Sequence, residues 1–421
     1  MPAEPHKIIV PMRPARFNAA RMASSKVTHL FTQFRSLGGV ESVLQRHYAT
    51  DADWGLASRF IIYFEPETEP LARVQFLGFD RRTTIRGARG RFGAATAIDA
   101  PTIAVYHDMW GMPSLADLDQ ASRRVLLLHG QTPGMLESLS YRREWLDGVL
   151  CVNEALRQMV RPCVSHLSEG RIGVVPYPIS PPPLTLQRRP LNQRPLVLGF
   201  CGRLQVQQKR VDRLPAVCQN LDQRGLNYRL EFLGDGPDRA WLENQFPDRR
   251  RFLFHGRKKG DEYWRILAEW DAILFTSDYE GTPISMLEAL SVGVVPIYPR
   301  IATGGDAYAA WVRPDLLYEP GDFAHVATTL AGLGRASEAE WQSLRLRCTK
   351  AVSPHVGDAY LAQFAAFLHQ VDEWPKVSQA NFPRRPPLVD DLPFRWLERV
   401  GAVRRFFRRL ARPRETPPLR A

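Results

Sequence analysis

Apolar runs of strand length alternate along the chain with segments whose apolar residues recur at helical spacing. The first half contains six such runs, VTHLF, RFIIYF, TIAVYH, RVLLLH, GVLCV and RIGVVP, and each predicts a strand. After the first run, a predicted helix places Val43, Leu44, His47 and Tyr48 on one side. This alternation is typical of doubly wound α/β folds.

The alternation returns more regularly after residue 195. LVLGF precedes an amphipathic helix that ends at Gly225, and further strands and helices are predicted at YRLEFLG, DRAWLENQF, RFLFHG, DEYWRILAEW, DAILFTS, PISMLEAL and VVPIYP. Residues 180–195 contain five prolines and no apolar period, which indicates a linker. We therefore expect two Rossmann-like lobes, residues 26–190 and 191–350. A ligand cleft should lie between them, because parallel sheets bind ligands at the carboxyl ends of their strands.

The two ends of the chain carry different signals. Residues 1–25 predict a disordered basic arm, with Met22 as an alternative start. A transit peptide is less favoured, and no secretory signal is expected because an apolar core segment is missing. Residues 351–374 predict a helix that packs back on the lobes. Residues 375–421 predict a proline-rich linker and a basic amphipathic tail.

Composition and charge narrow the class of protein. Of 421 residues, 44% are hydrophobic and 24% charged, as in a globular protein. No apolar run approaches the roughly 18–20 residues that span a bilayer. Five cysteines without a CxxC pair argue against a disulfide scaffold or a zinc site and indicate a reducing cytoplasm. Twelve basic and four acidic residues in 376–421 give +8 of the net +12, so we expect no nucleic-acid partner.

Within the tail, residues 394–412 interleave apolar side chains with arginines at helical spacing. A basic amphipathic helix of this kind suits an anionic membrane surface. We therefore expect peripheral association with the inner face of the membrane. Docking of the tail on the protein's own surface and RNA binding are the alternatives.

The richest candidate for chemistry is YEGTPISMLEAL, which follows the apolar run DAILFTS. Pro283 suits the first position of a helix and Thr282 suits its N-cap. The backbone N–H groups expected to point out of the helix start are those of Ile284, Ser285 and Met286. Free N–H groups at a helix start predict an anion site.

Two carboxylates flank this helix start. Glu280 precedes the helix, and Glu288 lies in its second turn, roughly 7 Å along the axis from Pro283 at about 1.5 Å per residue. This spacing does not favour a shared proton. It suits two acids that accept hydrogen bonds from hydroxyls at the two ends of an elongated ligand. Ordinary surface acids are the alternative interpretation.

A second motif, GRLQVQQK, lies where a strand ends. Arg203 follows Gly202, and Lys209 comes six residues after the arginine. An arginine fork and a lysine point charge at this edge could hold a diphosphate, and solvated loop cations are the alternative. Two glycine turns, GDGP at 234–237 and GG at 38–39, would let the backbone approach a phosphate. Neither a dinucleotide GxGxxG nor a P-loop is present.

In this order, GGVE, GRLQVQQK, GDGP and EGTPISMLEA resemble the motifs of the retaining GT-B glycosyltransferases of family 4, the group 1 glycosyltransferases. The resemblance covers about residues 26–370 and is strongest over 197–297. It implies an α/β GT-B fold and the transfer of a sugar from a nucleoside diphosphate donor, with retention and without a cofactor. The implied acceptor is a hydroxyl of a glycan or a lipid-linked carrier, in cell-surface polysaccharide or glycolipid biosynthesis.

The resemblance also implies roles for single residues. It gives catalytic roles to Glu280, His129, Arg203 and Lys209. It gives donor binding to Gly39, Gly202, Arg203, Lys209, Arg257, Ser285, Met286 and Glu288. It gives the acceptor side to His107 and Asp108. A structural role for either histidine is the alternative, and PYPIS at 176–180 departs from the family pattern.

One rival pattern points to a metal. Asp51-Ala52-Asp53 forms a D-x-D, but it follows a predicted helix in a polar turn rather than an apolar strand. We therefore expect no catalytic metal, with the diphosphate charge met by Arg203, Lys209 and helix N-termini. Other function classes left open are an inactive GT-B scaffold that binds membrane or RNA, and a GT-B epimerase or phosphorylase.

Overall fold

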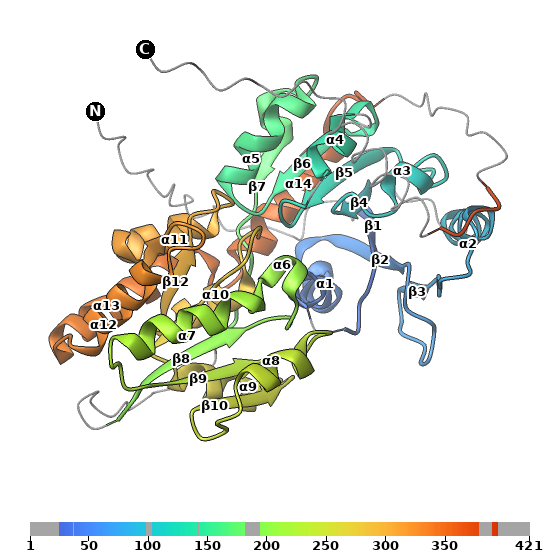
Figure 1. Ribbon diagram of the computed structural model, residues 1–421. Helices are drawn as coiled ribbons and strands as arrows, with labels where there is room; N and C mark the ends of the chain where they lie inside the picture. Colours follow the sequence, from blue (N-terminus) through green and yellow to red (C-terminus); the bar gives the residue numbers. More distant parts are fainter. Residues whose placement is uncertain are drawn as a thin grey trace, which may run out of the picture.

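The computed structural model describes residues 25–36, 38–97, 103–132, 134–140, 143–181, 194–378 and 390–394. Within these ranges the chain forms two parallel β-sheets, each accompanied by helices, as the sequence predicted (Figure 1). Nearly all of the expected arm, most of the linker and the tail from residue 395 onward lie outside the described residues.

The first lobe is built on a seven-stranded sheet in the order β3-β2-β1-β4-β5-β6-β7. Its strands are β1 (Ser25–Phe31), β2 (Leu56–Ile62), β3 (Val74–Phe76), β4 (Ile103–His107), β5 (Arg123–Leu128), β6 (Gly148–Cys151) and β7 (Ile172–Val174). Every residue of β4 is buried, which explains its unbroken apolar run. The strand order reverses between β1 and β4, so the ligand edge of this sheet is expected at their carboxyl ends.

Helices connect these strands. They are α1 (Gly39–Thr50), the 3-10 turn η2 (Asp51–Trp54), α2 (Ile85–Ala97), α3 (Met112–Leu115), α4 (Met135–Ser140), η3 (Arg143–Trp145), α5 (Glu154–Val160), η4 (Arg161–Val164) and η5 (Glu169–Arg171). Helix α1 buries Val43, Leu44 and His47 as its spacing predicted. Helix α2 was not predicted, because its glycines and arginines hide the apolar period. It is nevertheless packed through Ile85 and Phe92.

The second lobe repeats the arrangement with a six-stranded sheet in the order β10-β9-β8-β11-β12-β13. Its strands are β8 (Leu196–Cys201), β9 (Tyr228–Leu233), β10 (Phe252–Gly256), β11 (Ala272–Leu274), β12 (Val295–Pro299) and β13 (Leu317–Tyr318). Here the order reverses between β8 and β11. The two motifs richest in candidate chemistry follow these two strands.

The helices of this lobe are α6 (Val206–Lys209), η7 (Val211–Arg213), α7 (Leu214–Gln223), α8 (Arg239–Gln245), α9 (Gly260–Glu269), α10 (Ile284–Ser291), α11 (Gly305–Val312), η8 (Pro314–Leu316), α12 (Phe323–Gly334) and α13 (Glu338–Val352). Helix α7 carries its apolar residues on one face, as predicted. Helix α13 begins with a capping box between Ser337 and Glu340, a local signal for its start.

After η9 (Ser353–His355), the last described helix, α14 (Ala359–Glu373), returns to the first lobe. Tyr360 bonds to His47 of α1, and Ser25 of β1 bonds to Asp372. Figure 1 shows α14 beside first-lobe elements, in line with these contacts. Of residues 351–374, the first two end α13, and α14 packs on the first lobe through these bonds.

A short segment, residues 390–394, lies against the first lobe beyond a stretch outside the described residues. Phe394 is buried, and its N–H donates to Thr83 O at 2.8 Å. Ile85 N–H donates in turn to Leu392 O at 2.9 Å. The rest of the predicted amphipathic helix, 395–412, lies outside the described residues. Among the residues described, no helix combines the length and apolar character needed to cross a membrane.

Candidate active site

The carboxyl ends of β8 and β9 meet where GRLQVQQK and GDGP follow them. A Cβ on Gly234 would lie 2.0 Å from Gly202 O, and a Cβ on Gly236 would lie 2.2 Å from Leu204 O. Such distances are shorter than real Cβ atoms tolerate, so the two turns pack backbone against backbone. The glycines of GDGP are therefore required by this contact, which brings the Gly202–Arg203 turn to the ligand edge of the sheet.

Lys209 and Glu280 form the central ion pair of this edge. Lys209 Nζ lies 2.6 Å from Glu280 Oε1, and Ser277 Oγ donates to the same oxygen at 2.5 Å. Thr276 Oγ1 also donates to Lys209 O at 2.7 Å, so the loops after β8 and β11 hold each other. Glu280 is buried, whereas Arg203 is exposed. The structure thus brings together the lysine and acid that the motifs predicted, with the arginine on the surface nearby in sequence.

Glu288 has a different partner, which the sequence did not reveal. Tyr263 of α9 donates its hydroxyl to Glu288 Oε2 at 2.5 Å, and the same hydroxyl lies 3.7 Å from Cys201 Sγ. Burial raises the pKa of Glu288 to about 7, and the Tyr263 hydrogen bond opposes that rise. A carboxyl with a raised pKa can accept a hydrogen bond from a ligand hydroxyl when ionised and can donate one when protonated.

The start of α10 differs in detail from the sequence prediction. Pro283, not Thr282, is the N-cap, and the helix begins at Ile284. Met286 N–H donates to Pro283 O at 3.0 Å. Met286 is therefore a poorer phosphate donor than expected, because its N–H already has an acceptor. Ser285 is fixed by a 3.3 Å hydrogen bond from its Oγ to Cys201 O.

The first lobe reaches this edge through the turn before α1. A Cβ on Gly39 would lie 3.2 Å from Ile284 Cδ1, so the glycine turn faces the start of α10. Glu41, the acid of GGVE, is buried and accepts from Ser36 Oγ at 2.9 Å. Burial raises the pKa of Glu41, and the charge of Arg203 opposes the rise. Glu41 was not predicted as a site residue, although it stands within a quoted motif.

His129 also lies at the boundary between the lobes. Gly130 pairs with Gly281 as an isolated bridge, and a Cβ on Gly281 would lie 2.1 Å from His129 O. The imidazole bonds to Tyr177 OH through Nδ1 at 2.5 Å and to His107 Nδ1 through Nε2 at 2.8 Å. Burial lowers the pKa of His129 to about 3, so the ring is neutral. Both of its nitrogens are engaged inside the protein.

His107 does not line the acceptor side, contrary to expectation. It is fully buried, and its nitrogens bond to His129 and, at 2.9 Å, to His29. Asp108, at the end of the same strand, accepts from His129 N–H at 2.8 Å, and burial raises its pKa to about 7. Asp108 therefore supports the loop that carries His129. Arg257 is exposed just after β10.

Asn153 joins the lobes directly, although no motif singled it out. Its Nδ2 donates to Thr282 Oγ1 at 2.9 Å and to Thr303 O at 3.1 Å. Its Oδ1 accepts from Leu156 N–H and caps α5. One side chain therefore both starts a helix of the first lobe and holds the residue before Pro283 in the second.

The D-x-D pattern does not form a pair of metal-facing carboxylates, because Asp51 is fully buried and Asp53 exposed. Asp51 instead lies with His29 and His47, and their ligand atoms fall within 4.8 Å of one another. Imidazole and carboxylate groups are common metal ligands, so these three side chains could hold a cation. They are also hydrogen-bonded to each other, at 3.1 Å for His29 and 2.8 Å for His47.

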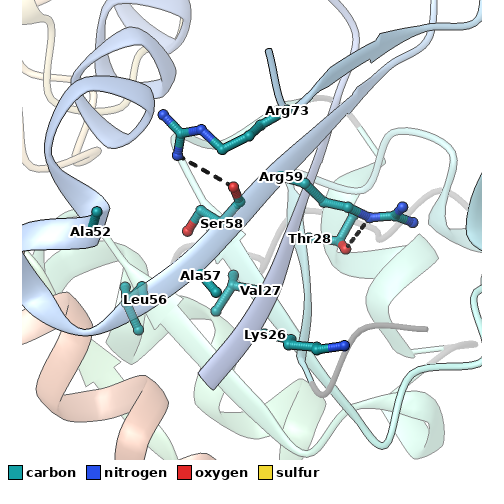
Figure 2. Close-up of a pocket in the computed structure, with 9 residues that line it drawn as sticks. All are labelled: Lys26, Val27, Thr28, Ala52, Leu56, Ala57, Ser58, Arg59 and Arg73. Atoms are coloured by element: carbon teal, nitrogen blue, oxygen red, sulfur yellow. Dashed lines mark hydrogen bonds between the residues drawn. The ribbon is translucent and has the colours of Figure 1, made fainter. Parts of the chain in front are cut away.

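A cavity of about 370 Å³ lies at the amino ends of β1 and β2 in the first sheet, opposite the carboxyl ends where a ligand is expected (Figure 2). Its basic lining residues are Lys26, Arg59 and Arg73, and Figure 2 shows Arg59 bonded to Thr28 and Arg73 to Ser58. Ligands of doubly wound sheets bind at the carboxyl edge, so this cavity is separate from the predicted site.

Residues 195–335 match the family model of the group 1 glycosyl transferases. This segment holds three of the four motifs, GRLQVQQK, GDGP and EGTPISMLEA. A lipopolysaccharide 1,6-galactosyltransferase of Escherichia coli (strain K12) is 33% identical over 144 residues. That alignment covers 31% of this chain and 37% of the relative, little more than a third of its length.

Solved structures resemble almost the whole described fold. An apo lipopolysaccharide outer core galactosyltransferase has a TM-score of 0.62 at 18% identity, covering 82% of this chain and 99% of that one. A pneumococcal O-GlcNAc transferase in complex with UDP and GlcNAc also has a TM-score of 0.62, at 8% identity, covering 83% and 99%. These likenesses show the GT-B fold. Both the fold and the resemblance to group 1 glycosyltransferases that the motifs predicted are confirmed.

Proposed function

We propose that this protein is a retaining glycosyltransferase that moves a sugar from a nucleoside diphosphate to a hydroxyl acceptor. The observation that carries the proposal is the Lys209–Glu280 pair, held at 2.6 Å where the second sheet reverses its strand order. This pair lies within the segment that matches the group 1 family model. A buried acid neutralised by a lysine at such an edge suits a ligand that carries both hydroxyls and negative charge.

The donor diphosphate would bind Arg203, Lys209 and the backbone N–H groups of Ile284 and Ser285 at the start of α10. Positive charge and a helix N-terminus stabilise the leaving diphosphate as its charge develops. Gly39 would approach it from the first lobe, where it already faces Ile284. Glu288 would bind the ribose hydroxyls, with Tyr263 orienting its carboxyl from 2.5 Å. Arg257 would border the base.

Glu280 would contact the transferred sugar. The acceptor oxygen would form its bond to the anomeric carbon on the face that the diphosphate leaves, so that configuration is retained. As the carbon–oxygen bond to phosphate breaks, its electron pair stays on the phosphate oxygen, which takes the acceptor's proton. No carboxylate nucleophile is then needed, and the protein contributes positioning and electrostatic stabilisation.

A UDP-sugar is the first donor to test, since the pneumococcal neighbour is described in complex with UDP. The galactosyltransferase relative, whose name refers to lipopolysaccharide, supports UDP-galactose and a cell-surface glycan or lipid-linked acceptor. Such an acceptor would suit a cytoplasmic enzyme held at the inner face of the membrane by residues 395–412.

The test is a donor screen followed by product analysis. Thermal shift with UDP, GDP and ADP sugars identifies the donor, because a ligand at about 100 times its dissociation constant adds roughly 2.7 kcal/mol of apparent stability. The anomeric configuration of the product, read by NMR, should match that of the donor. Activity should persist in excess EDTA. An epimerised donor, phosphorolysis, or binding without turnover across a broad acceptor panel would each contradict the proposal.

A further inference from the structure

Seven polar side chains form one hydrogen-bonded row through the core of the first lobe. In order they are Tyr177, His129, His107, His29, Asp51, His47 and Tyr360, called here the buried network. Successive distances are 2.5, 2.8, 2.9, 3.1, 2.8 and 2.7 Å. No member is more than 6% exposed. The network begins beside the Gly130–Gly281 contact between the lobes and ends on α14.

The carboxylate is the one charged acceptor in this row, and it sets the direction of the bonds around it. Asp51 accepts from His29 Nε2, from His47 Nδ1 and from Ser58 Oγ at 2.5 Å. Burial raises the pKa of Asp51, but its two histidine partners outweigh burial and hold that pKa well below its usual range, so Asp51 is ionised and cannot donate. His29 must therefore carry its proton on Nε2, and His47 on Nδ1.

The protonated nitrogen of His29 in turn determines which nitrogen donates in His107 and then in His129. A neutral imidazole has one N–H, so His29 Nδ1 can only accept, and its donor is His107 Nε2. His107 Nδ1 accepts in turn from His129 Nε2. His129 Nδ1 is left as an acceptor, so Tyr177 OH, which also lies 3.3 Å from His129 O, donates to it at the shorter distance of 2.5 Å. Burial lowers the pKa of His29, His107 and His129, which agrees with neutral rings.

A metal ion held by Asp51, His29 and His47 would give the opposite direction. A metal on His29 Nε2 leaves the proton on Nδ1, which would then donate to His107 Nε2. The same logic moves the proton of His129 to Nδ1, where it would donate to Tyr177. The two assignments therefore predict opposite tautomers of His129. Hydrogen bonding satisfies every nitrogen of the network without a metal.

We propose that Asp51, acting through His29 and His107, is the positioning residue for His129. It fixes the Nε2–H tautomer and leaves Nδ1 as an acceptor where the lobes meet. Phe60 stacks on His29 with ring centroids 4.8 Å apart and keeps that ring in line. If the proposed function holds, a substrate hydroxyl that displaces Tyr177 must donate to His129 and cannot accept from it.

The wild-type protein gives the first test. In ¹⁵N-histidine-labelled protein at pH 7, long-range ¹H–¹⁵N correlations distinguish protonated from unprotonated ring nitrogens. We expect Nε2–H for His29, His107 and His129 and Nδ1–H for His47, unchanged by EDTA or by added zinc. An Nδ1–H signature for His129, with or without zinc, would overturn the proposal. This measurement does not depend on sugar transfer, so it stands whether or not the proposed function does.

Two matched variants test the positioning role. Asp51→Asn removes the charge that sets the direction and should leave His129 with mixed tautomers. Tyr360→Phe removes the hydrogen bond to His47, on the side of Asp51 away from His129. This variant should keep the Nε2–H tautomer of His129 and the wild-type turnover. With the donor and acceptor that the screen identifies, kcat of Asp51→Asn should fall at least about tenfold if His129 accepts from the substrate hydroxyl, because the wrong imidazole tautomer cannot make that hydrogen bond.

The donor KM should change less than twofold in Asp51→Asn if the acid acts only through His129. Should Asp51→Asn fail to fold, His29→Phe is the substitute. It interrupts the hydrogen bonds that connect Asp51 to His107 and leaves Asp51 bonded to His47 and Ser58. Mixed tautomers of His129 in that variant support the proposal. A pure Nε2–H signature in either folded variant would refute it, since His129 would then be oriented without Asp51.

Discussion

Asn153 Nδ2 donates a 2.9 Å hydrogen bond to Thr282 Oγ1 across the boundary between the two lobes. Thr282 is buried and directly precedes Pro283, which caps α10. The bond therefore ties a helix start in the first lobe to the helix start proposed to hold the donor phosphates.

Thr282→Val should raise the donor KM about fivefold, because one neutral hydrogen bond contributes about 1 kcal/mol. Its Tm should also fall, because one N–H of the buried Asn153 Nδ2 loses its acceptor while the other keeps its bond to Thr303 O. Asn153→Ala should raise KM similarly and also lower stability by about 1 kcal/mol through loss of the α5 cap. Steady-state kinetics and thermal melts check both variants. An unchanged KM in the two variants would show that this bond does not hold the productive arrangement.

Lys209→Ala and Arg203→Ala should each weaken binding of the cognate nucleoside diphosphate. A charge-assisted hydrogen bond contributes roughly 1.5–3 kcal/mol, so a loss of about tenfold to a hundredfold is expected. Calorimetric titration measures it, with Lys350→Ala on the exposed side of α13 as the control. Full affinity in both site variants would remove them from the diphosphate site.

Glu280→Gln should mainly lower kcat, and Glu288→Gln should mainly raise the donor KM. Glu280 is proposed to face the reacting sugar, where interactions can strengthen in the transition state, whereas the ribose is unchanged during transfer. Steady-state kinetics on each variant decides between the two roles. If the effects are exchanged, the assignments of the two acids are reversed.

The pH dependence of stability should reveal the buried state of Glu288. Its pKa is raised from 4.5 to about 7. Between these values the native state binds more protons than the unfolded state, so this group's contribution to stability falls as pH rises. The Tm of Glu288→Gln minus that of wild type should therefore become more positive from pH 5 to pH 8. Glu262→Gln, on the exposed surface of α9, serves as the control variant.

Removing residues 395–421 should release the protein from anionic vesicles and leave its melt unchanged. Each basic residue near such a surface contributes about 1 kcal/mol, and the binding should weaken with salt. Removing residues 390–421 should also lower the Tm, because Phe394 is buried between Phe64 and Phe79. Co-sedimentation at two salt concentrations tests the first claim. Equal sedimentation of full-length and shortened protein would show that the tail is no anchor.

Local sequence patterns predicted the two sheets and the loops that carry the site. Apolar runs of strand length and short glycine motifs are local signals, so Lys209 and Glu280 could be expected at one edge before any coordinates. Tyr263 could not be expected there, because a tyrosine on an amphipathic helix usually packs in the core.

The buried network shows why other contacts of the site could not be predicted from the sequence. His29 and His107 are 78 residues apart, and His47 and Tyr360 are 313 apart. No spacing rule joins such residues, and their contact depends on the order of strands in the sheet. The family resemblance placed His107, which ends a strand, on the acceptor side. The direction of its side chain, into the core, is decided by tertiary packing.

The return of α14 has a consequence for the order in which the protein folds. This helix supplies Tyr360 and Phe364 to the first lobe's interior, while the second lobe occupies the sequence between. The first lobe is thus discontinuous in sequence, and the second, from 194 to about 352, is continuous. Contacts that close such long loops form late. During synthesis the second lobe can therefore complete its core first, and the lobe made earliest is finished last.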